Sequence, residues 1–128
     1  MRKIFILLFF APLLMATTCD DDDRYHPGYP CTEIAVAGLN VTVTLDGNAN
    51  ITSDGITVTA RSGNYIEDLV PDFSGAPMFS GAIERTGSYI ITANKQGYET
   101  FVSQPVNVSS DRCHVIPQQL TVNLLPNP

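Results

Sequence analysis

The 128-residue sequence is poor in the residues on which metal centres and nucleic-acid interfaces depend. It has no tryptophan, two histidines, three cysteines, and 7 basic residues against 13 acidic ones. So few basic side chains leave no stripe that could follow a phosphate backbone, and we expect no nucleic-acid partner. With no His-Glu-x-x-His or paired Cys-x-x-Cys motif, the sequence predicts no metal site. No glycine-rich loop precedes a helical pattern, so we expect no phosphate-bearing cofactor, nor any other cofactor.

Histidine, which a catalytic triad requires, is also scarce. A triad needs a histidine that a carboxylate orients. His114 has Asp111 only three residues away, a pair too local to predict such a site. The adjacent Cys113 would point to the opposite face of a strand from His114. A hydrolase built from scattered carboxylates is the remaining catalytic alternative, and we predict that the protein is not an enzyme.

Long hydrophobic runs are absent apart from one near the start of the chain. Arg2 and Lys3 precede the uncharged run from Ile4 to Met15, which Pro12 interrupts. A helix that spans a bilayer needs about 20 apolar residues, so this shorter run favours a secretory signal over a transmembrane helix. We therefore predict a signal peptide over residues 1–18 and an exported protein.

A cysteine lies where this signal would end, in the stretch MATTCDDDD over residues 15–23. The stretch resembles the processing site of bacterial lipoproteins, in which small residues precede a cysteine that receives lipid. Ala16 and Thr18 differ from the residues that are usual in that pattern. The resemblance implies a diacylglycerol and an amide-linked acyl chain on Cys19, and two or more chains give stable anchoring. The alternative is cleavage by an ordinary signal peptidase, which would release a soluble protein.

Four aspartates follow Cys19 and begin an acidic segment, residues 19–30, that we interpret as a solvated tether. They could collect Ca²⁺, but a tight calcium site needs about six to eight oxygens at fixed geometry. Beyond residue 18, five basic and 13 acidic residues remain, a formal charge of −8. An anionic bilayer surface repels such a chain, so the lipid would hold it there. We expect the bacterial cell envelope, at the outer membrane or cell surface rather than the inner membrane.

Two further cysteines, Cys31 and Cys113, lie near the two ends of the remaining sequence. An even number of cysteines in an exported chain favours a disulfide. Two buried free thiols are the alternative. A bond between Cys31 and Cys113 would close the domain that we predict over residues 31–128.

Within this domain, apolar and polar residues alternate in short segments that glycine turns separate, as in half-buried strands. No helical periodicity persists. The sequence thus predicts an all-β fold, a single antiparallel β-sandwich of about seven strands with a prealbumin-like or immunoglobulin-like architecture. The clearest strands are LNVTVTL (39–45), GITVTA (55–60), SYIITA (88–93) and QLTVNLL (119–125); FVSQPVNV (101–108) is broken at Pro105, and YIEDLV (65–70) and MFSGAIE (78–84) are weaker.

The stretch RTGSYIITANKQGYETFVSQPVNV, residues 85–108, resembles the second half of a carboxypeptidase regulatory-like domain, a family similar to transthyretin in fold. The resemblance extends over roughly residues 38–125, although the family often has a compact turn where this chain has a longer segment. It implies a folding or docking module, because in the carboxypeptidases the zinc site lies in a separate domain. The residues that carry it are Gly87, Tyr89, Gly97, Tyr98 and the last strand, Leu120 to Leu124.

Within this longer segment, residues 65–79 are the candidate contact surface. It combines Tyr65 and Phe73 with carboxylates that include Asp72, and recognition often lies in loops on a rigid scaffold. A solvated loop is the alternative. We therefore predict a non-catalytic binding or scaffolding module with a protein or glycan partner. The alternative function is a freely secreted transthyretin-like carrier or inhibitor.

Overall fold

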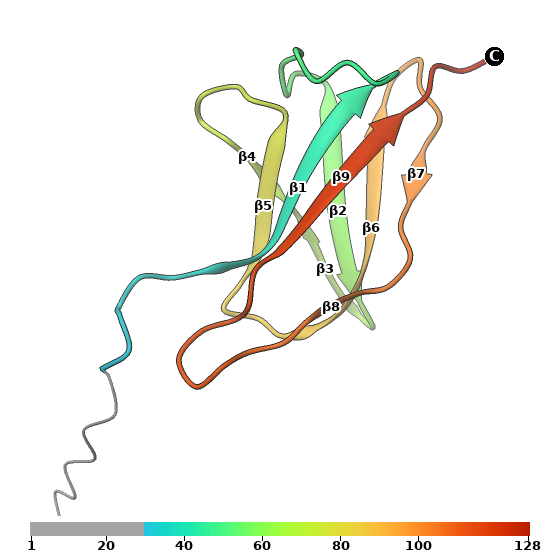
Figure 1. The fold of residues 1–128 in the computed structure, drawn as a ribbon. Helices are drawn as coiled ribbons and strands as arrows, with labels where there is room; N and C mark the ends of the chain where they lie inside the picture. The colour runs from blue at the N-terminus through green and yellow to red at the C-terminus, as the bar shows by residue number, and fades with distance from the viewer. Residues whose placement is uncertain (1–29) are drawn as a thin grey trace, which may run out of the picture. The chain divides into compact units, whose positions relative to one another are not determined.

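A computed structural model describes residues 30–128, and every regular element within them is a β-strand (Figure 1). The predicted signal peptide, Cys19 and nearly all of the predicted tether lie outside the described residues. The strands are β1 (Ala37–Leu45), β2 (Ile56–Ser62), β3 (Tyr65–Asp68), β4 (Val70–Pro71), β5 (Met78–Ile83), β6 (Gly87–Lys95), β7 (Phe101–Val102), β8 (Val106–Val108) and β9 (Gln118–Leu124).

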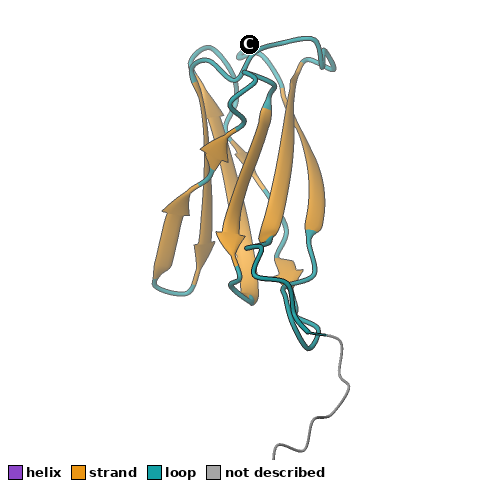
Figure 2. Cartoon of the chain, turned by 90° about the vertical axis from the view of Figure 1, so that its left-hand side faces the viewer, coloured by secondary structure: helices purple, strands orange, loops and turns teal. Residues whose placement is uncertain are grey.

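These strands form two sheets, as Figure 2 shows. The first has the order β4-β5-β1-β9, and the second has the order β3-β2-β6-β7, with β8 also paired to β6. The all-β prediction is therefore confirmed: residues 30–128 form two sheets and contain no helix.

One hydrophobic core draws on both sheets, and the predicted alternation accounts for it. In β1 the residues Leu39, Val41 and Val43 are fully buried while the residues between them are half-buried. Burying each such aliphatic side chain contributes about 1.5–3 kcal/mol relative to leaving it exposed. The same alternation buries Ile56, Val58 and Ala60 of β2, Tyr89, Ile91 and Ala93 of β6, and Val122 and Leu124 of β9.

The strand count differs from the prediction of about seven, because two weak segments each form two short strands. YIEDLV divides into β3 in one sheet and β4 in the other. At the division, the N–H of Leu69 donates to the Val58 carbonyl at 2.8 Å, and the Leu69 side chain is buried. FVSQPVNV divides into β7 and β8 at the predicted proline break. The structure thus has nine strands in its described part, two of them only two residues long.

The prediction of a wholly antiparallel fold is wrong for one pair. Strands β1 and β9 are parallel, with a register from Leu39 opposite Gln118 to Leu45 opposite Leu124. Alternation reports which face of a strand is buried, but it does not report the direction of the neighbouring strand. The direction here follows from residues 109–117, which lead from β8 beside β6 to the start of β9 beside β1.

The strand directions place the loops at two ends of this fold. Because β5 runs antiparallel to β1, Ile83 lies opposite Ala37 and Met78 lies opposite Thr42. The turn after β5 therefore lies at the end where β1 begins, which is also the end of Cys31. The loop of residues 72–77 lies at the other end, where the Val43 N–H donates to the Pro77 carbonyl at 2.8 Å.

Candidate functional site

The described residues form two hollows that differ in chemistry. One, of about 530 Å³, lies at the end where β1 begins and is lined mainly by polar residues around Cys113. The other, of about 430 Å³, lies along β4 and β5 and is lined mainly by apolar residues.

The first hollow contains the predicted disulfide. Cys31 and Cys113 are bonded, with their Cα atoms 5.3 Å apart and a sequence separation of 82 residues. This confirms the prediction that the two remaining cysteines pair. The bond fastens the segment before β1 to the loop before β9.

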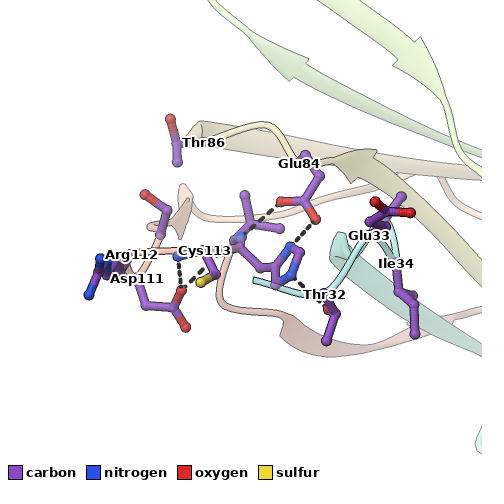
Figure 3. Close-up of a pocket in the computed structure, with 12 residues that line it drawn as sticks. Thr32, Glu33, Ile34, Glu84, Thr86, Asp111, Arg112 and Cys113 are labelled. Carbon is purple, nitrogen blue, oxygen red and sulfur yellow. Dashed lines mark hydrogen bonds and ion pairs between the residues drawn. The ribbon is translucent and has the colours of Figure 1, made fainter. Parts of the chain in front are cut away.

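Beside the disulfide, a hydrogen-bonded group joins three distant segments of the chain, as Figure 3 shows. The Nδ1 atom of His114 lies 2.6 Å from Oε1 of Glu84, and its Nε2 atom lies 3.0 Å from Oγ1 of Thr32. Glu84 also accepts hydrogen bonds from the backbone N–H groups of Val36 at 2.9 Å and Val115 at 3.2 Å. We call Thr32, Glu84 and His114 the polar latch.

Two carboxylates that line this hollow, Glu84 and Asp111, have lowered pKa values. Desolvation acts to raise the pKa of Glu84, but the hydrogen bonds from Val36, His114 and Val115 outweigh it and hold this pKa below its ordinary value. Asp111 accepts the backbone N–H groups of His114 at 2.9 Å and Cys113 at 2.7 Å, and these bonds lower its pKa. Both groups therefore favour the folded state most when charged.

The latch has the order hydroxyl, imidazole and carboxylate that a hydrolytic triad also has. Catalysis of acyl transfer needs free N–H donors aimed at the developing oxyanion. The N–H groups of Val36 and Val115 are occupied by Glu84, and those of Cys113 and His114 by Asp111. These four donors are therefore already used within the protein, and the hydrogen bonds tie the three segments together.

The sequence offered little sign of this latch. Glu84 is 30 residues from His114, and Thr32 is 82 residues away. The available signal was the cysteine pair, because Thr32 follows Cys31 and His114 follows Cys113. A disulfide between the cysteines brings the residues next to them together. In residues 30–128, no group of three or more histidine, cysteine or acidic side chains is placed to hold a metal ion.

The second hollow, which we call the edge hollow, gathers exposed apolar side chains at one edge of the first sheet. Phe73 is fully exposed, at 101% of its reference area, and Val70, Met78 and Ile83 are each exposed by 41% or more. Among the described residues that line it, none is basic and two are acidic. Its lining residues are Glu67, Val70, Pro71, Asp72, Phe73, Met78, Ser80, Gly81 and Ile83.

A tight turn holds Phe73 outward. Asp72 accepts hydrogen bonds from the Ser74 N–H at 3.3 Å and the Ser74 hydroxyl at 2.9 Å, and its carbonyl accepts the Gly75 N–H at 3.0 Å. The N–H of Asp72 donates to the Met78 carbonyl at 2.9 Å, which closes the loop onto β5. Side chains of Asp commonly stabilise turns in this way. The turn fixes the backbone on either side of Phe73, whose ring has no covering neighbour.

A carboxylate lies along the edge of β5, near the end of the strand that is farther from this turn. Glu67 accepts the Ala82 N–H at 2.6 Å through Oε1. Ala82 has a φ of 52°, a left-handed conformation that costs a non-glycine residue energy. Gly81 allows Leu69 to approach, because a Cβ atom there would overlap the Leu69 side chain. The second oxygen of Glu67 is left for a further hydrogen bond, since an ionised carboxylate has about four acceptor sites.

The structure brings two of the three predicted contact residues together. Asp72 and Phe73 line the edge hollow, whereas Tyr65 does not. The Tyr65 ring lies on β3 with the Arg85 guanidinium 3.6 Å from its centroid, and it packs against the core. Val70 and Met78 lie within the predicted contact segment, residues 65–79, but were not singled out, and Ile83 lies outside it. The signal for these residues was weak, because their segments carry only weak strand patterns.

In the part of the chain that the structure describes, no helix is long and apolar enough to cross a membrane. Comparison with known proteins gives no match, whether to a family model, to a curated protein or to a solved structure.

Proposed function

We propose that the protein is a lipoprotein of the bacterial envelope whose folded part is a non-catalytic binding module. A lipid on Cys19 would hold the chain at the membrane, and residues 19–30 would form the tether. The folded part would be a β-sandwich of the carboxypeptidase regulatory-like type. Two sheets around a single core support the sandwich, and the disulfide supports an oxidising compartment outside the cytoplasm.

The observation that carries the binding function is the edge hollow. Exposed apolar side chains that are scattered singly are normal, whereas a contiguous group with a polar rim marks an interaction site. Phe73, Val70, Met78 and Ile83 form such a group, and Glu67 and Asp72 supply polar atoms at it. A fully exposed aromatic side chain on a hydrogen-bonded turn provides contact area on a backbone that is already ordered.

The position of Phe73 within the edge hollow also favours this role. The tether would join the folded part at Cys31, at the end where β1 begins. The turn that carries Phe73 lies at the other end, where Ser53 N–H donates to the Gly75 carbonyl at 3.1 Å. A partner could therefore reach Phe73 without meeting the attachment point.

Site-specific photo-crosslinking in cells tests the proposal. A benzophenone amino acid replaces Phe73 in the full chain, and a matched control replaces Val102, which is 60% exposed on β7 of the other sheet. We expect a discrete crosslinked product at Phe73 that is absent at Val102 and is lost when Cys19→Ser removes the anchor. Equal or absent crosslinking at the two positions would contradict a binding role for the edge hollow.

A further inference from the structure

The edge hollow has a chemical character that specifies its partner. Resting on the binding function proposed above, we propose that the edge hollow binds a segment of another protein that carries basic and apolar side chains close together. The apolar side chains would pack on Phe73 and Met78, and the basic ones would pair with Glu67 and Asp72.

Charge complementarity is the first argument. Two carboxylates line the edge hollow and, among the described residues that line it, no basic side chain offsets them. The chain beyond residue 18 carries a formal charge of −8, which attracts a cationic partner at long range. An acidic partner would meet repulsion both in the hollow and on approach. Charge pairs of this kind give specificity and a faster association rate.

The apolar lining is the second argument, and it favours a peptide over a glycan. Aliphatic and thioether side chains from Val70, Met78 and Ile83 make up much of the hollow. Ser80 is the one neutral side chain with a hydroxyl among its lining residues. A sugar would need several hydrogen-bonding side chains for its hydroxyl groups, because polar groups left unpaired on binding cost affinity. A leucine or phenylalanine side chain has no polar group that binding could leave unpaired.

The edge of β4 determines how such a segment would lie. Adding a strand to a sheet edge requires free N–H and carbonyl groups along that edge. β4 has only two residues, and Pro71 has no N–H to donate. Beyond β4, Glu67 already occupies the Ala82 N–H of β5. The partner is therefore recognised through its side chains, and an extended main-chain pairing is blocked at these positions.

Four defined probes test this inference on the purified full-length protein. Three synthetic peptides of equal length alternate lysine with leucine, glutamate with leucine, and lysine with serine; the fourth probe is a chito-oligosaccharide. Because the chain contains no tryptophan, one tryptophan in each peptide reports its binding by fluorescence without background from the protein. Oligosaccharide binding is read from chemical-shift changes.

We expect the lysine–leucine peptide to bind at least tenfold more tightly than the other two peptides. Phe73→Ser should weaken it at least tenfold, since removing a central aromatic contact typically does so, while Val102→Ser should leave it unchanged. Phe73 makes no buried contact, so this variant keeps its fold. Glu67→Gln keeps an oxygen that accepts the Ala82 N–H, and Asp72→Asn keeps one that accepts the Ser74 N–H. Together the two changes should weaken binding and reduce its salt dependence.

Three results would overturn the inference: equal binding of the lysine–leucine and glutamate–leucine peptides, binding that Phe73→Ser does not change, or binding of the oligosaccharide alone. If the peptides fail but crosslinking at Phe73 remains specific, the partner chemistry is wrong and the binding function stands. If both experiments fail, the proposed function fails as well.

Discussion

Loss of the Cys31–Cys113 disulfide is predicted to remove a large share of the stability of the folded part. The bond closes a loop with a sequence separation of 82 residues. In the chain-entropy description, a loop of this length restricts the unfolded chain by about 4.5 kcal/mol at 25 °C. Domains of this size have total stabilities of about 5–15 kcal/mol. The reduced protein should therefore be folded only marginally.

The polar latch should keep the reduced protein in its native arrangement. Thr32 contacts His114 directly, and Glu84 holds both His114 and the backbone of Val36. These bonds fix the segment after Cys31 in the folded state whether or not the disulfide is present. The predicted loss thus comes from the greater freedom of the unfolded chain rather than from a rearranged native state.

Urea unfolding with and without a thiol-free phosphine reductant measures this effect, with Cys19→Ser in both samples to remove the lipid and the third thiol. For a slope of about 1–2 kcal/mol per molar urea, the midpoint should fall by about 2.3–4.5 M on reduction. The slope should rise, because the reduced unfolded chain exposes more surface. A loss below about 1 kcal/mol with an unchanged slope would refute the loop-closure reasoning.

Three further changes test the hydrophobic core, the close packing of Gly81 against Leu69 and the loss of stability at acid pH. Phe79→Ala, at a side chain that is 2% exposed, should cost about 3–5 kcal/mol in urea unfolding. Gly81→Ala should cost about 1–3 kcal/mol, because the new Cβ atom overlaps Leu69 and forces it to move. The pKa values of Glu84 and Asp111 are lowered in the folded state. The stability that these two groups contribute is therefore complete above the ordinary Glu and Asp pKa values. It is lost as the pH falls through the lowered pKa values of the folded state. Glu84→Gln should therefore flatten the acid limb of a plot of unfolding free energy against pH.

Each of these predictions has a matched control. Val102→Ala changes an exposed side chain and should alter stability little, whereas Phe79→Ala should lower it. Leu69→Ala combined with Gly81→Ala should remove the overlap, so a cost for the pair equal to the sum of the two single costs would contradict the packing argument. For the acid limb, Glu99→Gln changes an exposed carboxylate outside the latch, and an equal flattening by that variant would show that Glu84 has no special part.

The strand faces were predictable because burial alternates along half-exposed strands. Val41 and Val43 in β1, and Ile91 and Ala93 in β6, all lie in the core as their spacing indicates. The parallel partnership of β1 with β9 was not predictable, since a pattern within one strand carries no information on its neighbour. The passage of the chain at Leu69 from one sheet to the other was also not predictable, because a buried leucine fits a single continuous strand equally well.

The candidate sites were likewise predictable only in part, because their residues come from segments that are distant in sequence. The exposed turn at Asp72 and Phe73 was recognisable from an aromatic residue within an irregular acidic stretch. The apolar neighbours that complete the edge hollow come from β4 and β5, and only the pairing of these strands brings them beside Phe73. The polar latch likewise depends on the turn after β5 reaching His114 across 30 residues.

The intact mass of the mature protein, purified from its native host, tests the central claim most directly. A lipid-anchored envelope protein predicts the mass of residues 19–128 plus a diacylglycerol and an acyl chain, less the two hydrogens that a Cys31–Cys113 bond removes. An unlipidated mass would contradict the anchor and would favour a freely secreted carrier or inhibitor.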